Sequence, residues 1–268
     1  MLNKIYRVVI QGGGESYAES EDGVTFSALS GSFPEFASTG NVVEVEQLLA
    51  PVAPPAVYII GYNYAPDPAA ARKELGDTPV VVMKAPTTVV GPGATVRLPP
   101  PEVSSEVDYE GELAIIIGRP ARNVCPEEAL DYVFGYTIAN DLTARDLQRN
   151  GAGGQWVRGK NLDDFCPLGP CVLSAEDVSG DPFFSVKTFV NGELRQNDNT
   201  SSLIFSIPEI IAYLSSGNTL YPGTVILTGT PAGTGVKMEP KRFLAPGDEV
   251  RIEIDCIGEL SNYFVASA

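Results

Sequence analysis

The chain of 268 residues has 34 acidic and 18 basic residues, and its net charge is therefore −16. This excess of acid argues against nucleic acids and anionic membranes as partners. No stretch reaches the roughly 18 apolar residues of a membrane span, and the start lacks the apolar core of a secretory signal, so we expect a cytoplasmic protein.

The N-terminal part predicts a small β unit over residues 1–52, followed by a catalytic domain over residues 53–268. Short strands separated by polar, glycine-rich turns are expected over residues 4–10 and 24–28. Residues 29–45 have no clear period and are expected to be irregular.

The segment PDPAAARKELG (66–76) predicts a helix, because Asp67 can cap its N-terminus, Pro68 suits the first helical position, and Gly76 follows its end. The rest of the chain predicts mostly strands, with two further helices near 126–131 and 207–215. The expected strands cover residues 80–84, 107–117, 133–139, 169–174, 184–191, 224–228 and 249–255. We therefore expect an α+β fold that is mainly β, and not a doubly wound sheet.

The sequence contains no histidine, so the commonest general base near neutral pH and the commonest transition-metal ligand are both missing. Any catalysis must therefore use carboxylates, Lys, Tyr, Cys, Ser, Thr or a metal-bound water. The four cysteines include no CxxC pair, which predicts unpaired thiols in a reducing compartment.

Acidic residues alternate along EVDYEGELAIIIG (106–118), at Glu106, Asp108, Glu110 and Glu112. Alternate residues of a strand share one face, and the apolar run that follows is typical of a strand buried on both faces. Ionised carboxylates resist burial unless a cation offsets their charge. The alternative is a solvated acidic strand edge, and Glu106 and Asp108 are expected to lie around the ligands of such a site or at the surface.

A third acid, Asp141, stands where the apolar strand DYVFGYTIAN ends. Three carboxylates without a His or Cys cluster suit a hard cation that prefers oxygen, with Mg²⁺ favoured over Mn²⁺ or Ca²⁺. An octahedral ion with three protein ligands leaves positions for water and for a chelating substrate. Glu110, Glu112 and Asp141 are therefore the predicted metal ligands.

Several polar residues could serve this site. Lys160 lies in the loop-like segment RGKNLDDFCPLGP (158–170) and could act as a base or stabilise a developing oxyanion, unless it is a surface charge. Arg145 and Gln148 follow Asp141 by four and seven residues, so a helix there would place them near one face to hold a carboxylate, unless it is an ordinary surface helix. Thr230 follows a strand in a segment that could cradle an anion or form a simple tight turn.

Together these segments resemble the fumarylacetoacetate hydrolase family over roughly residues 56–265. The order and spacing of the motifs carry the resemblance. They are GYNY (61–64), MKAPTTVVGPG (83–93), VDYEGELAIIIG (107–118), NDLTARDLQ (140–148), GKNLDDFCPLGP (159–170), TLYPGTVILTGTPAG (219–233) and FLAPGDEVRIEIDCIGEL (243–260).

The resemblance implies a mixed β-roll catalytic domain that usually forms a homodimer. It implies Mg²⁺ or Mn²⁺ held by the three acids, with Lys160 as the active-site lysine. The implied substrate contacts are Arg145, Gln148, Thr230 and Tyr64. Members of the family act on small 2-oxo acids and β-dicarbonyl compounds, and the metal stabilises an enolate in each reaction.

One motif departs from the family pattern. Hydrolytic members resemble G-x-N-Y-x-x-H-x-x-E, in which the His–Glu pair activates water, but here Asp67 occupies the His position and Ala70 the Glu position. Asp67 and Glu74 are the remaining catalytic candidates, although Asp67 also suits a helix cap. C–C bond hydrolysis is the family default. The alternatives are a decarboxylase, tautomerase, isomerase or cyclase that needs no activated water, and a non-catalytic binding or scaffold member.

Overall fold

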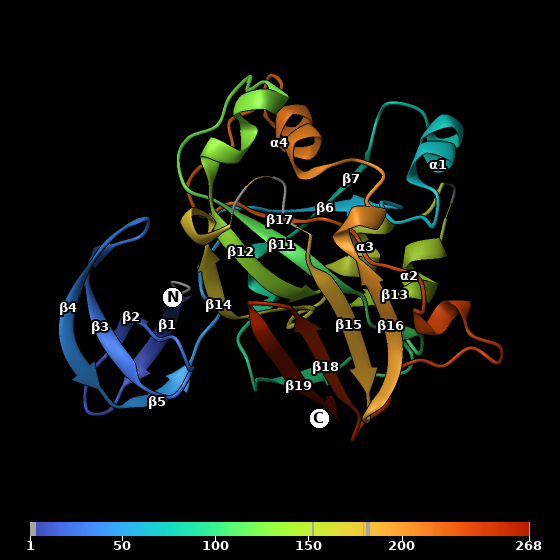
Figure 1. Ribbon diagram of the computed structural model, residues 1–268. Coiled ribbons are helices and arrows are strands. Elements are labelled where there is room, and N and C mark those ends of the chain that lie inside the picture. Colours follow the sequence, from blue (N-terminus) through green and yellow to red (C-terminus); the bar gives the residue numbers. More distant parts are fainter. Residues whose placement is uncertain (1–3, 152, 179, 181–182, 268) are drawn as a thin grey trace.

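The computed structural model describes residues 4–151, 153–178, 180 and 183–267, and most of its elements are strands (Figure 1). The prediction of a mainly β fold is confirmed. The largest sheet has twelve strands, ten of which follow the order β4-β3-β2-β1-β14-β12-β11-β17-β6-β7, with β5 beside β1 and β8 beside β14. They are β1 (Lys4–Ile10), β2 (Glu15–Glu19), β3 (Phe26–Ser32), β4 (Glu35–Val43), β5 (Val45–Leu48), β6 (Val57–Gly61), β7 (Val80–Lys84), β8 (Val89–Val90), β11 (Gly111–Ile117), β12 (Val133–Asn140), β14 (Cys166–Ser174) and β17 (Val225–Leu227).

Two smaller sheets complete the β structure. A five-stranded sheet lies in front of β11 and β12 in Figure 1, and its strands follow the order β16-β15-β18-β19-β9. They are β9 (Thr95–Leu98), β15 (Ser185–Val190), β16 (Glu193–Asn199), β18 (Glu249–Ile254) and β19 (Gly258–Ala266). A two-stranded ladder pairs β10 (Val107–Asp108) with β13 (Thr143–Ala144).

Short helices connect the strands. The α-helices are α1 (Pro68–Leu75), α2 (Arg145–Arg149), α3 (Trp156–Lys160) and α4 (Ile207–Ser215). The 3₁₀ helices are η1 (Pro86–Thr88), η2 (Pro126–Tyr132), η3 (Ala175–Asp177), η4 (Thr200–Ser202) and η5 (Gly235–Lys237). The two helices expected near 126–131 and 207–215 are present, although the first is 3₁₀, and α4 packs against it.

Helix α1 has the predicted ends. An Asp67 carboxylate oxygen accepts a hydrogen bond from the Ala70 N–H at 3.0 Å, Pro68 begins the helix, and Gly76 follows its last turn. No residue of α1 is buried. The helix is therefore held by its cap, by polar contacts and by partial packing of Ala71 against the core, without a buried apolar face.

Strand β11 lies at the centre of the molecule, and each of its seven residues is buried. Leu113, Ile115 and Ile117 face the larger apolar core, whereas Ala114 and Ile116 face a second core on the other side of the sheet. This alternation confirms that the strand is buried on both faces, as its apolar run predicts.

Two predictions about strands were wrong. Residues 29–45 are not irregular, because β3 and β4 form an antiparallel pair there that shifts register between Ser27 and Leu29. Their many small polar residues hide the period of two that marks a half-buried strand. Residues 107–117 are not one strand, because the ladder of β10 ends at Asp108 and β11 begins at Gly111.

The strands β1 to β5 form the curled unit that is blue in Figure 1, and β1 pairs with β14 of the central sheet. Phe33 and Phe36 of this unit pack near Phe134 of β12, with ring centroids 4.7 and 6.3 Å away. The division into residues 1–52 and 53–268 stays a prediction.

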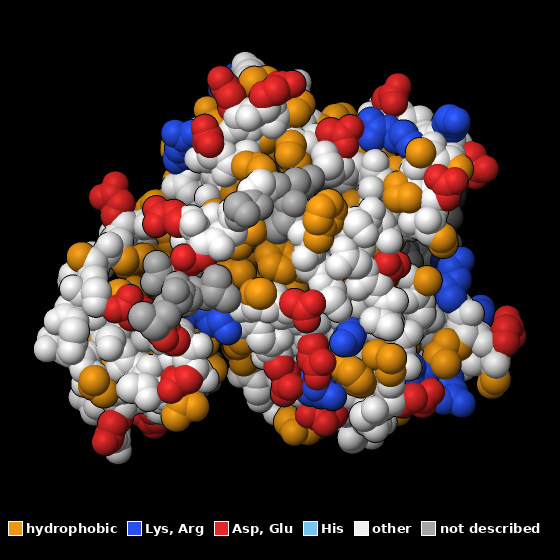
Figure 2. All heavy atoms as spheres, viewed as in Figure 1, with side chains coloured by type: hydrophobic (Ala, Val, Ile, Leu, Met, Phe, Trp, Pro, Cys, Tyr) orange, Lys and Arg blue, Asp and Glu red, His pale blue; other side chains and the backbone are white. Residues whose placement is uncertain are grey.

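The surface reflects the charge of the chain. In Figure 2, acidic side chains are spread over the visible face among fewer basic ones. No helix in the described part of the chain is long and apolar enough to cross a membrane.

Candidate active site

All buried charged residues among those that the structure describes belong to one cluster. Four carboxylates and three cations make up this charge cluster, and each member contacts or lies close to another. The members are Lys84, Asp108, Glu110, Glu112, Asp141, Arg145 and Lys160. Because burial of charge is costly without partners, this concentration at one point in the fold indicates a functional site.

The pairing of β11 with β12 brings the predicted metal ligands together. Gly111 lies opposite Asn140 in this antiparallel ladder, so Glu110 and Asp141 each stand one residue beyond the pair. The Asp141 N–H also donates to the Glu110 carbonyl at 2.8 Å. Carboxylate oxygens of Glu110, Glu112 and Asp141 all lie within 4.8 Å of one another, and all three residues are buried. The structure therefore brings these three acids together, and their role as metal ligands stays a prediction.

Lys160 lies beside two of the three acids. Its Nζ is 2.8 Å from Glu110 Oε2 and 2.9 Å from Thr143 Oγ1, and it also contacts Asp141 Oδ2. Burial favours the neutral amine, but the carboxylates of Asp141 and Glu110 outweigh it and raise the pKa of Lys160. Lys160 is the last residue of α3 rather than part of a loop, so a short helix aims its side chain inward.

Among the described residues, Glu112 is the one carboxylate of the charge cluster that has no Lys or Arg at salt-bridge distance. Its Oε2 accepts a hydrogen bond from the Gly229 N–H at 2.6 Å. Burial raises the pKa of Glu112 well above its usual range, and the nearby charges of Asp141 and Glu110 raise it further. A divalent cation between the three acids would relieve this repulsion. Three carboxylate oxygens also form a donor set that hard cations prefer, so the residues present fit such an ion.

Arg145 binds two acids of the charge cluster. Its Nε is 2.9 Å from Asp108 Oδ2, its Nη2 is 2.6 Å from Glu110 Oε1, and its Nη1 donates to Gln148 Oε1 at 3.3 Å. The expected helix begins at Arg145, but Asp141 lies before it and is separated from it by β13. Asp108 is buried, and it also accepts hydrogen bonds from the N–H groups of Gly235 and Val236.

Lys84 was missed by the sequence analysis. Its side chain is fully buried, and its Nζ lies 2.9 Å from Asp141 Oδ1. The same ammonium donates to the carbonyls of Leu142, Lys160 and Phe165 at 2.9, 2.6 and 2.8 Å. Burial lowers the pKa of Lys84, and Asp141 opposes this shift. Lys84 lies two residues after buried Val82 in β7, and this period of two was the available signal.

Backbone hydrogen bonds connect the segment that carries Thr230 to the predicted metal ligands. The Gly229 N–H binds Glu112, and the Thr230 hydroxyl donates to the Gly111 carbonyl at 3.0 Å, between the two predicted glutamate ligands. Gly111 itself allows β11 to approach β15 closely, because a Cβ there would lie 2.1 Å from Thr188 Oγ1.

The remaining predicted residues come from the segment after β6. The Tyr64 hydroxyl is buried, and burial together with the charge of Glu112 raises the pKa of Tyr64. Asp67 and Glu74 lie at the exposed helix α1 and outside the charge cluster. Their catalytic role and the substrate contact of Tyr64 stay predictions.

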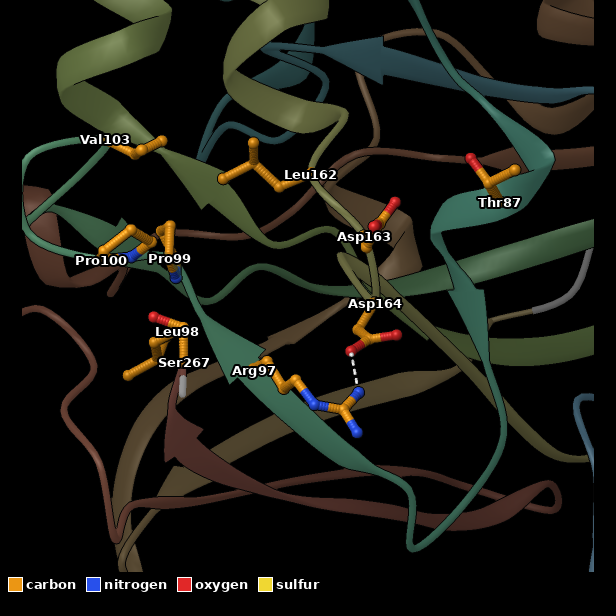
Figure 3. A pocket seen from close by; sticks show the side chains of 10 residues that line it. All are labelled: Thr87, Arg97, Leu98, Pro99, Pro100, Val103, Leu162, Asp163, Asp164 and Ser267. Atoms are coloured by element: carbon orange, nitrogen blue, oxygen red, sulfur yellow. Dashed lines mark hydrogen bonds and ion pairs between the residues drawn. The ribbon is translucent and has the colours of Figure 1, made fainter.

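A cavity of about 610 Å³ is lined in part by the loop that follows Lys160 (Figure 3). Figure 3 shows Arg97 reaching toward Asp164, and the two side chains form an ion pair of 3.4 Å. No member of the charge cluster lines this cavity. The cavity is therefore distinct from the candidate active site.

Comparison with known proteins agrees with the motifs and the geometry. A model of the C-terminal domain of fumarylacetoacetate hydrolase matches residues 56–265, which is most of the chain. The chain belongs to the fumarylacetoacetate hydrolase family. Within this family it is 43% identical over 216 residues to a mitochondrial oxaloacetate tautomerase of Xenopus laevis, covering 80% of this chain and 67% of the relative. It is 44% identical over 220 residues to an oxaloacetate tautomerase of Bacillus subtilis, covering 81% and 72%.

Solved structures of the fumarylacetoacetate hydrolase family share the fold. A 5-carboxymethyl-2-hydroxymuconate delta-isomerase from Mycobacterium smegmatis matches with a TM-score of 0.86 and 35% identity, over 98% of this chain and all of that one. A fumarylacetoacetate hydrolase from Exiguobacterium antarcticum matches with a TM-score of 0.84 and 36% identity, over 99% of this chain and all of that one. The predicted fold type of the catalytic domain is therefore confirmed.

Proposed function

We propose that this protein is a metal-dependent tautomerase of a 2-oxo dicarboxylic acid of the oxaloacetate type. The proposal rests on the charge cluster, in which three carboxylates lie close together and buried cations form ion pairs with them. Such a site suits an anionic substrate whose adjacent oxygens chelate a cation. Two oxaloacetate tautomerases that are more than 40% identical to this chain favour this non-hydrolytic reaction over C–C bond hydrolysis.

The proposed cofactor is Mg²⁺, with Mn²⁺ as the alternative. Glu110, Glu112 and Asp141 would hold the ion, because each offers a hard oxygen ligand within one small group. When bound, the ion supplies a Lewis acid that stabilises negative charge on the substrate oxygens.

The cations of the charge cluster would orient the substrate. The three N–H groups of Lys160 are engaged by Glu110, Asp141 and Thr143, so its role would be to place a positive charge near the oxygen on which enolate charge develops. Arg145 already contacts Gln148, and the two would bind a substrate carboxylate through remaining N–H donors. Both residues keep the substrate fixed while a proton moves between carbon and oxygen.

Hydrolysis lacks support from the chain itself. There is no histidine in the sequence to activate water, and the position expected for one is occupied by Asp67, which caps α1. The free-energy cost of burying these charges also argues against a scaffold without catalysis. The homodimer implied by the resemblance stays a prediction.

We expect the purified protein to accelerate ketonisation of enol-oxaloacetate at least about 100-fold in the presence of Mg²⁺. The enol absorbance reports this rate directly. EDTA should abolish the effect, and an excess of Mg²⁺ should restore it, while an acylpyruvate should not be cleaved. Turnover that is insensitive to EDTA would contradict the metal site, and rapid acylpyruvate cleavage would contradict the choice of reaction.

The catalytic role of Asp67 is tested by Asp67→Asn, because Asn caps a helix about as well as Asp. A general base at Asp67 predicts that this variant melts at the wild-type temperature and loses about 100-fold in turnover. Glu74→Gln is the companion change on α1. Wild-type turnover in both variants would leave Asp67 as a helix cap alone.

A further inference from the structure

The Thr230 hydroxyl belongs to a hydrogen-bond chain that begins at Gln196 of β16. Gln196 is buried, and its Oε1 accepts a hydrogen bond from the Gly111 N–H at 3.0 Å. Its Nε2 donates to the Pro231 carbonyl at 2.8 Å and to Thr230 Oγ1 at 2.8 Å. One carboxamide therefore ties β11 to the loop after β17.

The backbone partners determine the direction of every bond in this chain. A peptide N–H only donates and a carbonyl only accepts, so the contacts with Gly111 and Pro231 fix which end of the Gln196 amide carries the hydrogens. Thr230 Oγ1 must then accept from Gln196. Its own proton goes to the Gly111 carbonyl at 3.0 Å. The hydroxyl has one unused lone pair and no unused proton.

Thr230 borders the candidate active site. The Gly229 N–H, one residue before Thr230, binds Glu112, and Gly111 stands between Glu110 and Glu112. Gln196 is buried whereas Thr230 is half-buried, so Thr230 is the more accessible of the two residues.

We propose that Thr230 recognises the enol form of the substrate by accepting a hydrogen bond from its hydroxyl, and that Gln196 is the positioning residue that makes Thr230 an acceptor. This inference rests on the proposed function and deepens it. A keto acid presents only acceptor oxygens in its carbonyl and carboxylate groups, whereas its enol presents an O–H donor. An acceptor at position 230 therefore discriminates between the two tautomers, because two facing acceptors form no bond.

Two stable probes separate the alternatives. Oxalate presents only acceptors, and racemic malate carries a hydroxyl next to a carboxylate. Binding of both to the Mg²⁺-loaded protein is measured by calorimetry. We expect Thr230→Val to weaken malate about tenfold, as for a donor that loses its partner, and to change oxalate by less than about twofold. The control Thr230→Ser keeps the hydroxyl and should bind both probes within about twofold of wild type.

Gln196→Met tests the positioning role. Without the amide, the Thr230 hydroxyl can rotate and donate, so we expect the preference for malate over oxalate to fall at least about threefold. If this variant does not fold, the comparison of Thr230→Val with Thr230→Ser decides the matter. The affinity for Mg²⁺ alone, measured on each folded variant, should stay at the wild-type value.

Three results would overturn the inference while leaving the proposed function intact. In the first, Thr230→Val loses as much affinity for oxalate as for malate. In the second, its affinity for neither probe changes. In the third, it loses affinity for Mg²⁺ and not for malate, which would assign the lone pair to a metal-bound water. If wild-type protein with Mg²⁺ binds neither probe, the proposed function fails and this inference fails with it.

Discussion

Glu112→Gln should raise the melting temperature of the metal-free protein and reduce turnover with Mg²⁺ by at least about 100-fold. The two effects have one cause. Burial, followed by the charges of Asp141 and Glu110, raises the pKa of Glu112 in the folded protein, so the ionised carboxylate opposes folding until a cation arrives. Gln keeps an oxygen for the Gly229 N–H but carries no charge.

The sign of the pH dependence follows from the raised pKa of Glu112. A carboxyl whose folded-state pKa exceeds its unfolded value stabilises the fold at low pH, and this contribution is lost as the pH rises through the folded-state pKa. In EDTA, Glu112→Gln should therefore melt at a higher temperature than wild type. This difference should increase as the pH rises above the ordinary pKa of glutamate.

Glu106→Gln is the matched control, because Glu106 belongs to the same run of alternating acids but pairs with Arg149 at the surface. We expect it to change neither melting nor turnover noticeably, since exposed ion pairs contribute about 0–1 kcal/mol. A Glu112→Gln protein that melts below wild type in EDTA, or that binds Mg²⁺ normally, would contradict this account of the site.

Lys84→Met should destabilise the protein by about 3–5 kcal/mol, the usual scale for removing one partner of a buried ion pair. The change leaves Asp141 Oδ1 and the carbonyls of Leu142, Lys160 and Phe165 without the ammonium that they now share. In a chain of this size the melting temperature should fall by on the order of 10 °C. Turnover should fall as well, because Lys84 holds both Asp141 and the end of α3.

Thermal melts with and without Mg²⁺ measure the effect. Lys73→Met, on the exposed side of α1, removes the same charge from the surface and should change the midpoint little. A Lys84→Met protein as stable as wild type would mean that water or rearranged backbone replaces the ammonium.

The three acids could be predicted from the sequence because strand geometry determines their positions. Glu110 and Glu112 flank Gly111, and the antiparallel register places Asp141 beside them. A period of two and one strand end were sufficient to predict this group. The apolar run of β11 was informative for the same reason, since a strand buried on both faces has no polar alternation to obscure it.

The partners of these acids could not be predicted, because they depend on contacts between distant segments. Lys84 is 57 residues before Asp141 and reaches it only because β7 ends beside the site. Gln196 reaches Thr230 from a strand of the other sheet. The break between β10 and β11 was missed for a related reason, since the alternating acids suggest one continuous strand, whereas Asp108 turns to bind Arg145.

The pairing of Gly111 with Asn140 limits how the chain can change in length. Insertion or deletion of one residue between Gly111 and Ile117 would exchange the two faces of β11. Isoleucines of one core would then enter the other, and the glutamates would lose their alignment with Asp141. Engineering that adds or removes residues should therefore be confined to connecting loops, where the outline of a substrate pocket can be redrawn without shifting the central ladder.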